Sequence, residues 1–388
     1  MKNTVKKKIC FPITSRVHYA RQKQFLDILK KRKDVDLQLV VGGSVLLEKY
    51  GQKFLDAIRN DGHTINETLF NVIDGGNHVT MAKTAGLTAL EFSNSLYKLN
   101  PDIVVIRGDR FEQLAMAMVA AYLNKIVVHI EGGDVTGTID ESIRHAITKL
   151  AHAHLVTNKA AARRVIQMGE DPKMVWNVGS PDVEFAASVS KRLPAGFIDR
   201  FGIGDRIDLT KPFIIALQHP VTTEANNREH LEATLEAVDE LEIPTIWFWP
   251  NSDAGTAEMA KAIRIYREHG KIKSGKIHFL VDLLPEDFIA LLKRASCIVG
   301  NSSAGIKESS YFGIPVVNVG TRQANRMRGE NVLDVGYNKE SIKKAIAKQM
   351  AHGLYKRSTL YYKPNTSKKM AEIISGLNVG IQKKFHDA

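Results

Sequence analysis

The chain has 388 residues, of which 44% are hydrophobic and 25% are charged, and its formal net charge is +12. This length fits two domains, and the composition is that of a folded globular protein rather than a disordered chain. No apolar stretch approaches the roughly 18 residues of a membrane span, and the apolar run at 9–13 is too short for a signal peptide. We therefore expect no membrane partner.

The positive charge and the two cysteines have ordinary explanations. The excess lysines lie in runs such as 6–8 and 30–33 and in the last quarter of the chain, without an interleaved Arg/aromatic pattern or zinc-finger spacing. We therefore expect no nucleic-acid partner, whereas a basic protein suits a small polyanion such as a nucleoside diphosphate sugar. Cys10 and Cys297 lie in short apolar runs without partners at metal or redox spacing, which favours buried thiols in a reducing cytoplasm.

Short β-branched runs alternate with amphipathic stretches almost from end to end. Strands are predicted at 8–13, 36–41, 103–107, 126–130, 154–157 and 174–178, and then at 213–218, 245–249, 276–280, 297–299 and 316–319. Helices predicted between them include 21–31, 111–124, 224–241 and 287–295. This alternation predicts an α/β fold with parallel sheets covered by helices on both faces.

Proline and glycine interrupt the stretch from Pro194 to Pro212, which is the predicted domain boundary. We expect an N-terminal domain at 1–195, a C-terminal domain at 205–365, and a last segment at 366–388 whose helix packs back on the N-terminal domain. Two doubly wound domains place ligands at the carboxyl ends of their strands, so facing domains would share one cleft. The sequence has no G-x-G-x-x-G and no P-loop motif, so another element must hold any phosphates.

The strongest local pattern runs from Cys297 to Glu308, as a strand, a turn of small residues and a helix start. Ser302 and Ser303 would present hydroxyl and N–H groups at the start of that helix, which favours binding of an anion such as a diphosphate. Glu308, farther along the helix, could accept hydrogen bonds from ribose hydroxyls. The alternative is a serine that only caps the helix.

Two carboxylates follow neighbouring predicted strands. Asp109 comes directly after the strand at 103–107, and Glu131 follows the strand at 126–130. Carboxylates that meet in a cleft can raise one another's pKa and so suit proton abstraction from carbon. The alternative is that Asp109 forms a structural ion pair with Arg107 or Arg110.

The segment Thr138-Ile-Asp-Glu141 has the pattern of a capping box, with Thr138 as N-cap and Glu141 as its partner. This assignment leaves Asp140 free to face the cleft. The histidines that recur on or just after this helix, at 145, 152 and 154, have no acidic neighbours at ligand spacing, so we expect packed or surface side chains rather than a metal site. His219 follows the first strand of the second domain, beside a proline, and is a candidate general acid or base.

An ordered set of motifs resembles the hydrolysing UDP-N-acetylglucosamine 2-epimerases, which supply N-acetylmannosamine for sialic-acid-type sugars. The matching runs are Gly-Asp-Arg at 108–110, His-Ile-Glu-Gly-Gly at 129–133, Thr-Ile-Asp-Glu-Ser-Ile-Arg-His at 138–145, Gln-His-Pro-Val-Thr-Thr at 218–223, Pro-Asn-Ser-Asp-Ala-Gly at 250–255, Gly-Asn-Ser-Ser at 300–303 and Gly-Thr-Arg-Gln at 320–323. Each motif alone is modest, but together they run in order from about Ser15 to Asn331.

The resemblance implies two Rossmann-like domains in a GT-B-like arrangement, with no nicotinamide cofactor, no essential metal and a homodimer or homotetramer. It implies elimination of UDP to a 2-acetamidoglucal, followed by addition of water. Carried over by position, the catalytic residues are Asp109, Glu131, Asp140 and His219. The positions that hold the UDP-sugar are Arg16, Arg110, Asn251, Leu283, Ser302, Ser303, Glu308 and Arg322.

The loop Gly132–Ile139 is short, which favours hydrolysis over the reversible epimerisation of a sister branch that has a longer loop here. The sequence departs from the family pattern in three places: Ser15-Arg16-Val17-His18-Tyr19 replaces Thr-Arg-Ala-Asp-Tyr, Arg107 replaces histidine, and Lys307 replaces arginine. The first two lie where the sugar should sit, so they leave the identity of the sugar open. The alternatives are a UDP- or GDP-linked 2,4-diacetamido-6-deoxy sugar, a non-hydrolysing epimerase, a GT-B glycosyltransferase and a nucleotide-sugar sensor without turnover.

Overall fold

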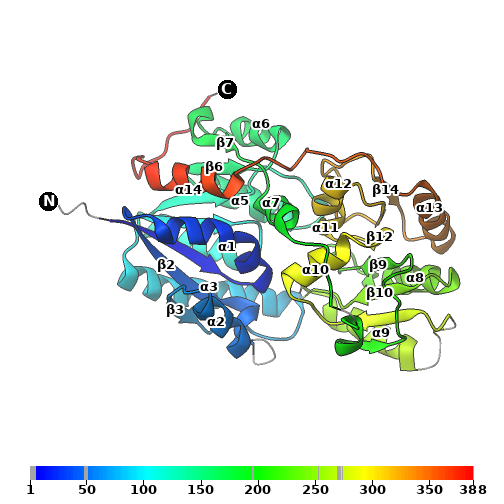
Figure 1. Cartoon of the computed structure of the whole chain (residues 1–388). Helices are drawn as coiled ribbons and strands as arrows, with labels where there is room; N and C mark the ends of the chain where they lie inside the picture. Colours follow the sequence, from blue (N-terminus) through cyan, green and yellow to red (C-terminus); the bar gives the residue numbers. More distant parts are fainter. Residues whose placement is uncertain are drawn as a thin grey trace.

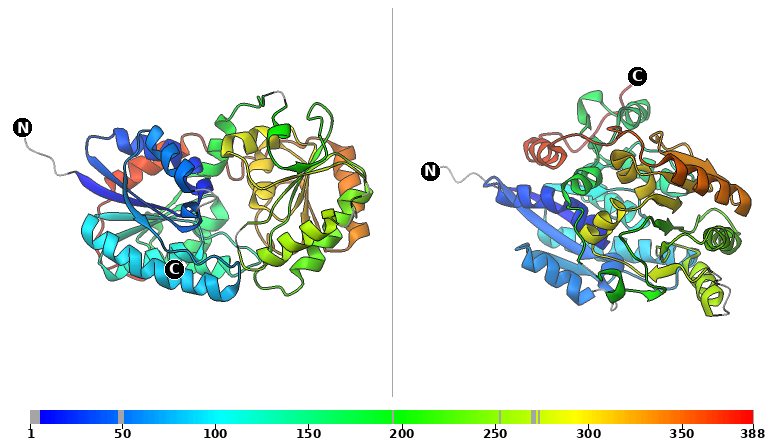
Figure 2. Two further views of the ribbon diagram at one scale, coloured as in Figure 1. Left: turned by 90° about the horizontal axis from the view of Figure 1, so that it is seen from below. Right: turned by 45° about the vertical axis from the view of Figure 1, so that its right-hand side comes forward.

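The computed structural model describes residues 6–47, 51–194, 196–251, 253–268, 272 and 274–387. Two lobes lie side by side, one formed by the N-terminal half and one by the C-terminal half (Figures 1 and 2). Each lobe is built around a seven-stranded sheet, so the predicted α/β class is confirmed, with two sheets that are parallel except for one short edge strand.

The first sheet is entirely parallel. Its strands, in spatial order, are β3 (Ile65–Leu69), β2 (Val35–Gly42), β1 (Lys7–Ile13), β4 (Ile103–Arg107), β5 (Ile126–Ile130), β6 (Ala153–Val156) and β7 (Val175–Asn177). The helices of this lobe are α1 (Arg16–Lys31), α2 (Gly51–Asn60), α3 (His78–Leu99), α4 (Phe111–Tyr122), α5 (Asp140–Leu150), α6 (Lys159–Gln167) and α7 (Pro181–Ser188), with short 3₁₀ helices at Gly43–Leu46 and Pro172–Met174. The order reverses between β1 and β4, which is the switch point where such sheets bind ligands.

The second sheet repeats this plan. Its order is β14 (Val332–Val335), β13 (Val316–Val319), β12 (Cys297–Gly300), β9 (Ile214–Leu217), β10 (Thr245–Phe248), β11 (Ile277–Leu280) and β8 (Ile203–Gly204). Its helices are α8 (Asn227–Glu240), α9 (Thr256–Glu268), α10 (Pro285–Leu292), α11 (Ser303–Ile306), α12 (Glu308–Phe312) and α13 (Lys339–His352), with a 3₁₀ turn at Ile198–Arg200. The switch point lies between β9 and β12.

Each sheet buries its central strands under helices on both faces. In the first lobe, α1, α2 and α14 (Thr366–Gly376) pack on one face, while α3, α4 and α5 pack on the other. Residues that point to alternate faces, such as Phe11 and Cys10 in β1, are both fully buried. This two-sided burial explains why the sequence shows unbroken apolar runs at the strands.

The C-terminal helix α14 lies against α1 of the N-terminal lobe, although the helix that precedes it in the chain, α13, belongs to the C-terminal lobe (Figure 1). Lys7, at the start of β1, also ties α14 to the N-terminal lobe, because its ammonium group donates hydrogen bonds of 2.7 Å to the carbonyls of Ser375 and Leu377. The strand β8 precedes residue 205, where we expected the second domain to begin, yet it pairs antiparallel with β11 of the second sheet.

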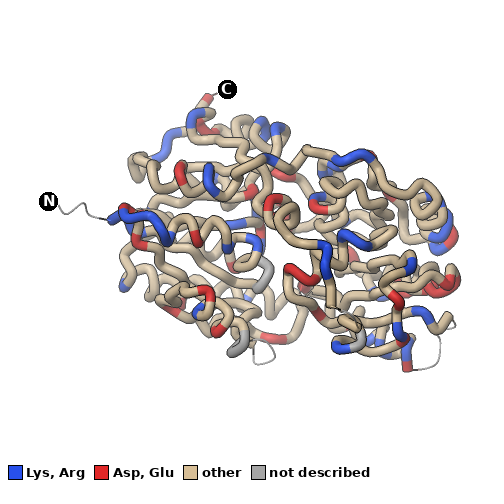
Figure 3. Tube along the Cα trace, viewed as in Figure 1, with Lys and Arg blue, Asp and Glu red and all other residues tan. Residues whose placement is uncertain are grey.

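Basic and acidic positions are interspersed over both lobes in Figure 3. No helix among the described residues is long and apolar enough to cross a membrane.

Candidate functional site

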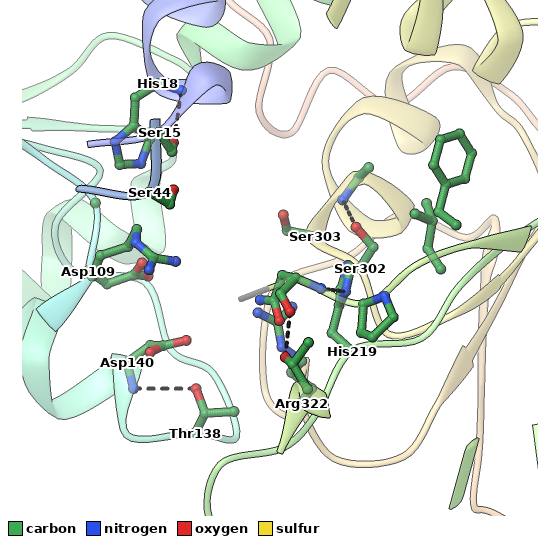
Figure 4. A pocket seen from close by; sticks show the side chains of 18 of the residues that line it. Ser15, His18, Ser44, Asp109, Thr138, Asp140, His219, Ser302, Ser303 and Arg322 are labelled. Carbon is green, nitrogen blue, oxygen red and sulfur yellow. Dashed lines mark hydrogen bonds between the residues drawn. The ribbon is translucent and has the colours of Figure 1, made fainter. Parts of the chain in front are cut away.

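A cavity of about 980 Å³ lies between the two lobes, at the carboxyl ends of both sheets. Most of the residues predicted for the site line it, namely Asp109, Arg110, Glu131, Asp140, His219, Asn251, Ser302, Ser303 and Arg322. Figure 4 shows Asp109 and Asp140 on the wall formed by the N-terminal lobe, opposite His219, Ser302, Ser303 and Arg322. The two switch points therefore face one another across one space.

Two of the predicted residues lie elsewhere, and a third has a side chain outside the described part. Glu308 is fully buried, with its Oε1 2.9 Å from Nη2 of Arg21, and it does not line the cavity. The prediction that it reaches ribose hydroxyls therefore has no support from its position. Leu283 is buried in the hydrophobic core of the second lobe, and the Arg16 side chain lies outside the described residues.

Asp109 is held by an arginine that we did not consider. It follows β4 and Gly108, whose φ of +78° makes the sharp turn that glycine allows. Its carboxylate pairs with the Arg144 guanidinium, so neither ion pair considered from the sequence, with Arg107 or Arg110, is present. Burial alone would raise the pKa of Asp109, but Arg144 and other cations outweigh it and bring the pKa to about 2. Asp109 is therefore a fixed anion at neutral pH.

Glu131 is fixed as an anion in the same way. Arg107 Nη2 lies 3.0 Å from Glu131 Oε2, and Lys307 Nζ lies 2.8 Å from Oε1. Burial would raise the pKa of Glu131, but Lys307 and Arg107 hold it well below its usual range. Glu131 has a φ of +71°, a left-handed conformation that is uncommon outside glycine and often marks functional positions.

Asp140 is the carboxylate that can carry a proton near neutrality. Burial raises its pKa to about 6, and the nearby charges of Asp109 and Asp253 add to this effect. The expected repulsion between carboxylates is therefore present, but it acts on Asp140 rather than within the pair Asp109 and Glu131. A group with this pKa can both accept and release a proton at physiological pH.

The helix that begins at Asp140 lacks the predicted capping box. The hydroxyl of Thr138 accepts a hydrogen bond of 3.3 Å from the N–H of Asp140, and Glu141 Oε2 accepts one of 2.6 Å from the N–H of Thr136. Ile139, in a helical conformation, takes the N-cap position. Glu141 thus fixes the loop before the helix, and the prediction of a structural role for it agrees with this contact even though its partner differs.

His219 is held in one orientation by the loop after β10. Its Nδ1 accepts a hydrogen bond of 3.1 Å from the backbone N–H of Asn251, so the hydrogen of the neutral ring lies on Nε2. Burial, with a contribution from Arg322, lowers its pKa to about 3. His219 is therefore a neutral hydrogen-bond donor throughout the physiological range.

The serine turn after β12 forms the opposite end of the cavity. Ser302 is the N-cap of α11, and its Oγ accepts a hydrogen bond from the N–H of Ala304 at 3.4 Å. Arg322 Nη1 lies 3.3 Å from the carbonyl of Asn301, and its Nη2 lies 3.7 Å from Asp253. Hydroxyl groups, backbone N–H groups and an arginine thus lie together where an anion can bind.

Several residues of the site were missed by the sequence analysis. Arg144 is part of the run 138–145 and one helical turn beyond Asp140, so its spacing could have indicated a partner for a carboxylate. Asn301, in the loop after β12, joins this loop to the one after β9. Its side chain accepts a hydrogen bond of 2.8 Å from the N–H of His219 and donates one of 2.8 Å to its C=O. No sequence pattern indicates this contact between residues 82 positions apart.

The lobes also contact one another through backbone groups beside the cavity. The N–H of Gly137 donates to the carbonyl of Arg322 at 3.1 Å, and the N–H of Gly255 donates to the carbonyl of Gly76 at 3.0 Å. A Cβ at Gly137 would lie 1.9 Å from the carbonyl oxygen of Thr321, so only glycine permits this approach. Within the described part of the chain, no group of three or more His, Cys, Asp or Glu side chains is arranged to hold a metal ion.

Residues 27–375 match the UDP-N-acetylglucosamine 2-epimerase family. The chain is 34% identical to the UDP-N-acetylglucosamine 2-epimerase of Neisseria meningitidis, with 99% of both chains covered. It is 31% identical to a UDP-N,N'-diacetylbacillosamine 2-epimerase (hydrolyzing) of Legionella pneumophila, with 95% of both chains covered. The crystal structure of Methanocaldococcus jannaschii UDP-GlcNAc 2-epimerase in complex with UDP-GlcNAc and UDP aligns with a TM-score of 0.75 at 18% identity, over 95% of this chain and 99% of that one. The shared fold is the predicted GT-B-like pair of Rossmann-like domains.

Proposed function

The chain belongs to the UDP-N-acetylglucosamine 2-epimerase family, and on this premise we propose that it is a hydrolysing sugar-nucleotide 2-epimerase. The reaction would convert UDP-N-acetylglucosamine and water into N-acetylmannosamine and UDP. One observation carries this proposal: Asp109 and Asp140 lie on one wall of the cavity, opposite the serine turn of the other lobe. Glu131, which follows β5 of the N-terminal lobe, lines the same cavity. A sugar between these walls would have proton-transfer groups on one side and anion-binding groups on the other.

The chemistry has two steps. In the first, the C2 proton of the sugar passes to a base and the bond from C1 to the diphosphate oxygen breaks, which gives a 2-acetamidoglucal and UDP. In the second, the hydroxyl of water adds to C1 and a proton returns to C2 on the opposite face. Removal and return of the proton therefore require groups on two sides of the sugar.

We assign the first proton transfer to Asp140, because its pKa of about 6 makes it ionised at neutral pH and a stronger base than an ordinary carboxylate. Asp109 and Glu131 stay ionised and would stabilise the positive charge that develops at C1 as the diphosphate departs. His219, on the facing wall, would use its Nε2–H to hold the water or to direct a proton to the other face.

The diphosphate would bind at Ser302 and Ser303, with Arg322 and Arg110 as its charged partners. Both arginines line the cavity and both approach Asp253, with Arg110 Nη1 at 3.3 Å from its carboxylate. Arginine suits this task because its planar guanidinium can bond two phosphate oxygens at once.

The short loop at 132–139 supports hydrolysis rather than reversible epimerisation. In this loop Gly137 lies directly against the backbone of Thr321 and Arg322, so little room remains for a second sugar nucleotide between these segments. The Legionella pneumophila relative is named as a hydrolysing enzyme, which agrees with this proposal.

The sugar itself has two candidates. The Neisseria meningitidis relative is named for UDP-N-acetylglucosamine and the Legionella pneumophila relative for UDP-N,N'-diacetylbacillosamine. We place UDP-N-acetylglucosamine first and a UDP- or GDP-linked 2,4-diacetamido-6-deoxy sugar second. Incubation with a panel of these nucleotides, with release of nucleoside diphosphate and of reducing sugar followed together, tests the proposal. Release of neither from any of them contradicts it.

We further propose a homodimer, formed through α3 and α4. The outer face of these helices exposes a group of large apolar side chains, namely Leu90 (64% exposed), Tyr97 (83%), Met118 (39%) and Tyr122 (83%). Interfaces between copies are enriched in such aromatic and methionine side chains. Around Gly86, the position of a Cβ would meet open space, so another helix could approach closely here.

The charges on α3 favour a second copy of the same helix as the partner. In an antiparallel two-fold pairing that crosses at Leu87, Lys83 of one copy lies opposite Glu91 of the other, and the reverse. Lys83→Glu should therefore weaken the dimer in light scattering, and adding Glu91→Lys should restore it. A wild-type chain that is monomeric at micromolar concentration contradicts this proposal.

A further inference from the structure

Glu131 is held at both of its oxygens by cations that come from different lobes. Oε2 faces Arg107, which lies at the end of β4 in the same lobe, at 3.0 Å. Oε1 accepts a hydrogen bond of 2.8 Å from Nζ of Lys307, which belongs to the C-terminal lobe. Both cations are buried, with 5% of the Arg107 side chain and 6% of the Lys307 side chain exposed.

The two cations are not equivalent. Arg107 also approaches Asp182, at 2.5 Å, and so it divides its charge between two carboxylates. Lys307 has Glu131 as its one ion-pair partner among the described residues. If Lys307 were absent, Oε1 would keep only the Ser180 hydroxyl, at 3.4 Å, and the carboxylate could turn toward Arg107.

Lys307 also has a place in the fold that ties it to the serine turn. It directly follows α11, which begins after the N-cap Ser302, and it directly precedes α12. The ammonium group and the serine hydroxyl groups therefore belong to one short segment that lines the cavity. Glu131 can reach this ammonium group only while the two lobes are together.

We propose that Lys307 is a positioning residue, which holds the Glu131 carboxylate in its working orientation when the lobes enclose a sugar nucleotide. This inference rests on the proposed function, since it assigns Glu131 a role in the reaction. Lys307 acts through Glu131 and does not itself exchange a proton with the sugar. The C-terminal lobe thus supplies the diphosphate site and also completes the catalytic wall of the N-terminal lobe.

Lys307 is one of several charged groups that act on Glu131, so the effect of removing its charge depends on the groups that remain. The other charged or titratable groups that face Glu131 come from β4, α1, α7 and the C-terminal lobe, and they are Arg107, His18, Arg21, Asp182, Arg326 and Tyr361. Loss of the Lys307 charge alone should raise the pKa of Glu131, because the remaining cations are shared with other carboxylates.

The test compares Lys307→Gln with Lys307→Arg, by measuring UDP release from UDP-N-acetylglucosamine between pH 5 and pH 9. Lys307→Gln should lower kcat about 10- to 100-fold, as expected for a misplaced catalytic group. It should also make the acidic limb of the profile steeper, because Glu131 with its raised pKa would then take up a proton at low pH in addition to Asp140. UDP affinity, measured by calorimetry, should change little. Lys307→Arg should restore most of the rate, because it returns a cation to the same carboxylate.

Lys383→Gln is the matched control, since Lys383 forms a similar pair with Glu170, at 2.5 Å, outside the cavity. It should cost stability without moving the pH profile. Unchanged kcat and pH profile in Lys307→Gln would overturn the inference. A wild-type protein that releases UDP from no sugar nucleotide overturns the proposed function, and the inference with it.

A double variant keeps the test decisive should Lys307→Gln fail to fold. Glu131→Gln combined with Lys307→Gln removes both charges of this ion pair, so no buried charge is left without the partner that it had in the pair. If Lys307 acts through Glu131, this double variant should be as slow as Glu131→Gln alone. A further loss of about tenfold or more would mean that Lys307 acts on something else.

Discussion

Asp109 and Asp140 lie on the same wall of the cavity, and Arg144 pairs with only one of them. Its guanidinium contacts Asp109 and holds that carboxylate ionised. Burial raises the pKa of Asp140 to about 6, and the negative charges of Asp109 and Asp253 add to this effect. The cations around Asp109, with Arg144 first among them, and the burial of Asp140 therefore make one of these carboxylates a fixed anion and the other a proton carrier.

The first prediction concerns the pH dependence of the reaction. If Asp140 is the base, kcat should rise as the pH increases through about 6, because the ionised form is the active one. Asp140→Asn should lose on the order of 10²-fold or more in kcat and should lose this limb of the profile. A rate that falls as the pH increases through 6 would instead identify Asp140 as an acid.

The second prediction concerns the stability of the same variant. The pKa of Asp140 is about 6 in the folded protein, whereas the ordinary value, which applies to the unfolded chain, is 3.8. Between these two pH values the folded state therefore binds more protons than the unfolded state. The free energy of unfolding should therefore fall as the pH increases from about 4 to 6. Relative to wild type, Asp140→Asn should gain about 1–3 kcal/mol at pH 8 and little at pH 4, as measured by urea unfolding.

Asp109→Asn should have the opposite effect on stability and lower the free energy of unfolding. It leaves the Arg144 guanidinium buried without its carboxylate, which should cost roughly 1–3 kcal/mol at pH 7 in addition to the catalytic loss. Glu141→Gln is the control for both variants, because a glutamine oxygen can still accept from the N–H of Thr136. An inactive Glu141→Gln beside an active Asp140→Asn would reverse the roles that we assign to these two residues.

The fourth prediction concerns the proposed diphosphate site. Ser302→Ala combined with Ser303→Ala removes two hydroxyl groups from the cavity and leaves the backbone N–H groups in place. UDP affinity should fall by roughly 1–3 kcal/mol in calorimetry, the usual loss for hydrogen bonds to a charged group. Unchanged affinity would place the diphosphate elsewhere in the cavity.

The fifth prediction concerns the contact between the lobes. Gly137→Ala places a methyl group 1.9 Å from the Thr321 carbonyl oxygen, so the loop before Asp140 must move away from the other lobe. We expect kcat to fall by about tenfold or more through displacement of Asp140. Gly336→Ala is the control, because a Cβ there has nothing within 4 Å. Equal activity in both variants would show that this contact does not position the catalytic wall.

Most of the fold was predictable because its signals are local. The strands β4, β5 and β13 have the predicted bounds, since each is rich in Val and Ile and buried at every position. Three strands, β3, β8 and β14, were not predicted from the sequence. β3 alternates partly buried and exposed residues, β8 has only two residues, and no position of β14 is fully buried. These strands lie at the edges of the two sheets, where few side chains are buried, so their sequences lack the run of apolar residues that marks a central strand.

The site was predictable as a set of residues but not as a set of charge states. Motif positions brought Asp109, Glu131 and Asp140 to one cavity, because they follow adjacent strands of one sheet. The partners of these carboxylates come from farther away, and Lys307 lies 176 residues from Glu131. Which carboxylate keeps its proton depends on such distant cations, and no spacing rule in the sequence carries that information.

The central claim is that the chain both inverts C2 and hydrolyses its sugar nucleotide. Incubation of the wild-type protein with UDP-N-acetylglucosamine in deuterium oxide, followed by NMR of the products, tests both parts in one measurement. We predict free N-acetylmannosamine that carries deuterium at C2, together with one equivalent of UDP. An equilibrium mixture of intact UDP-sugars, with no free sugar and no UDP, would contradict the claim.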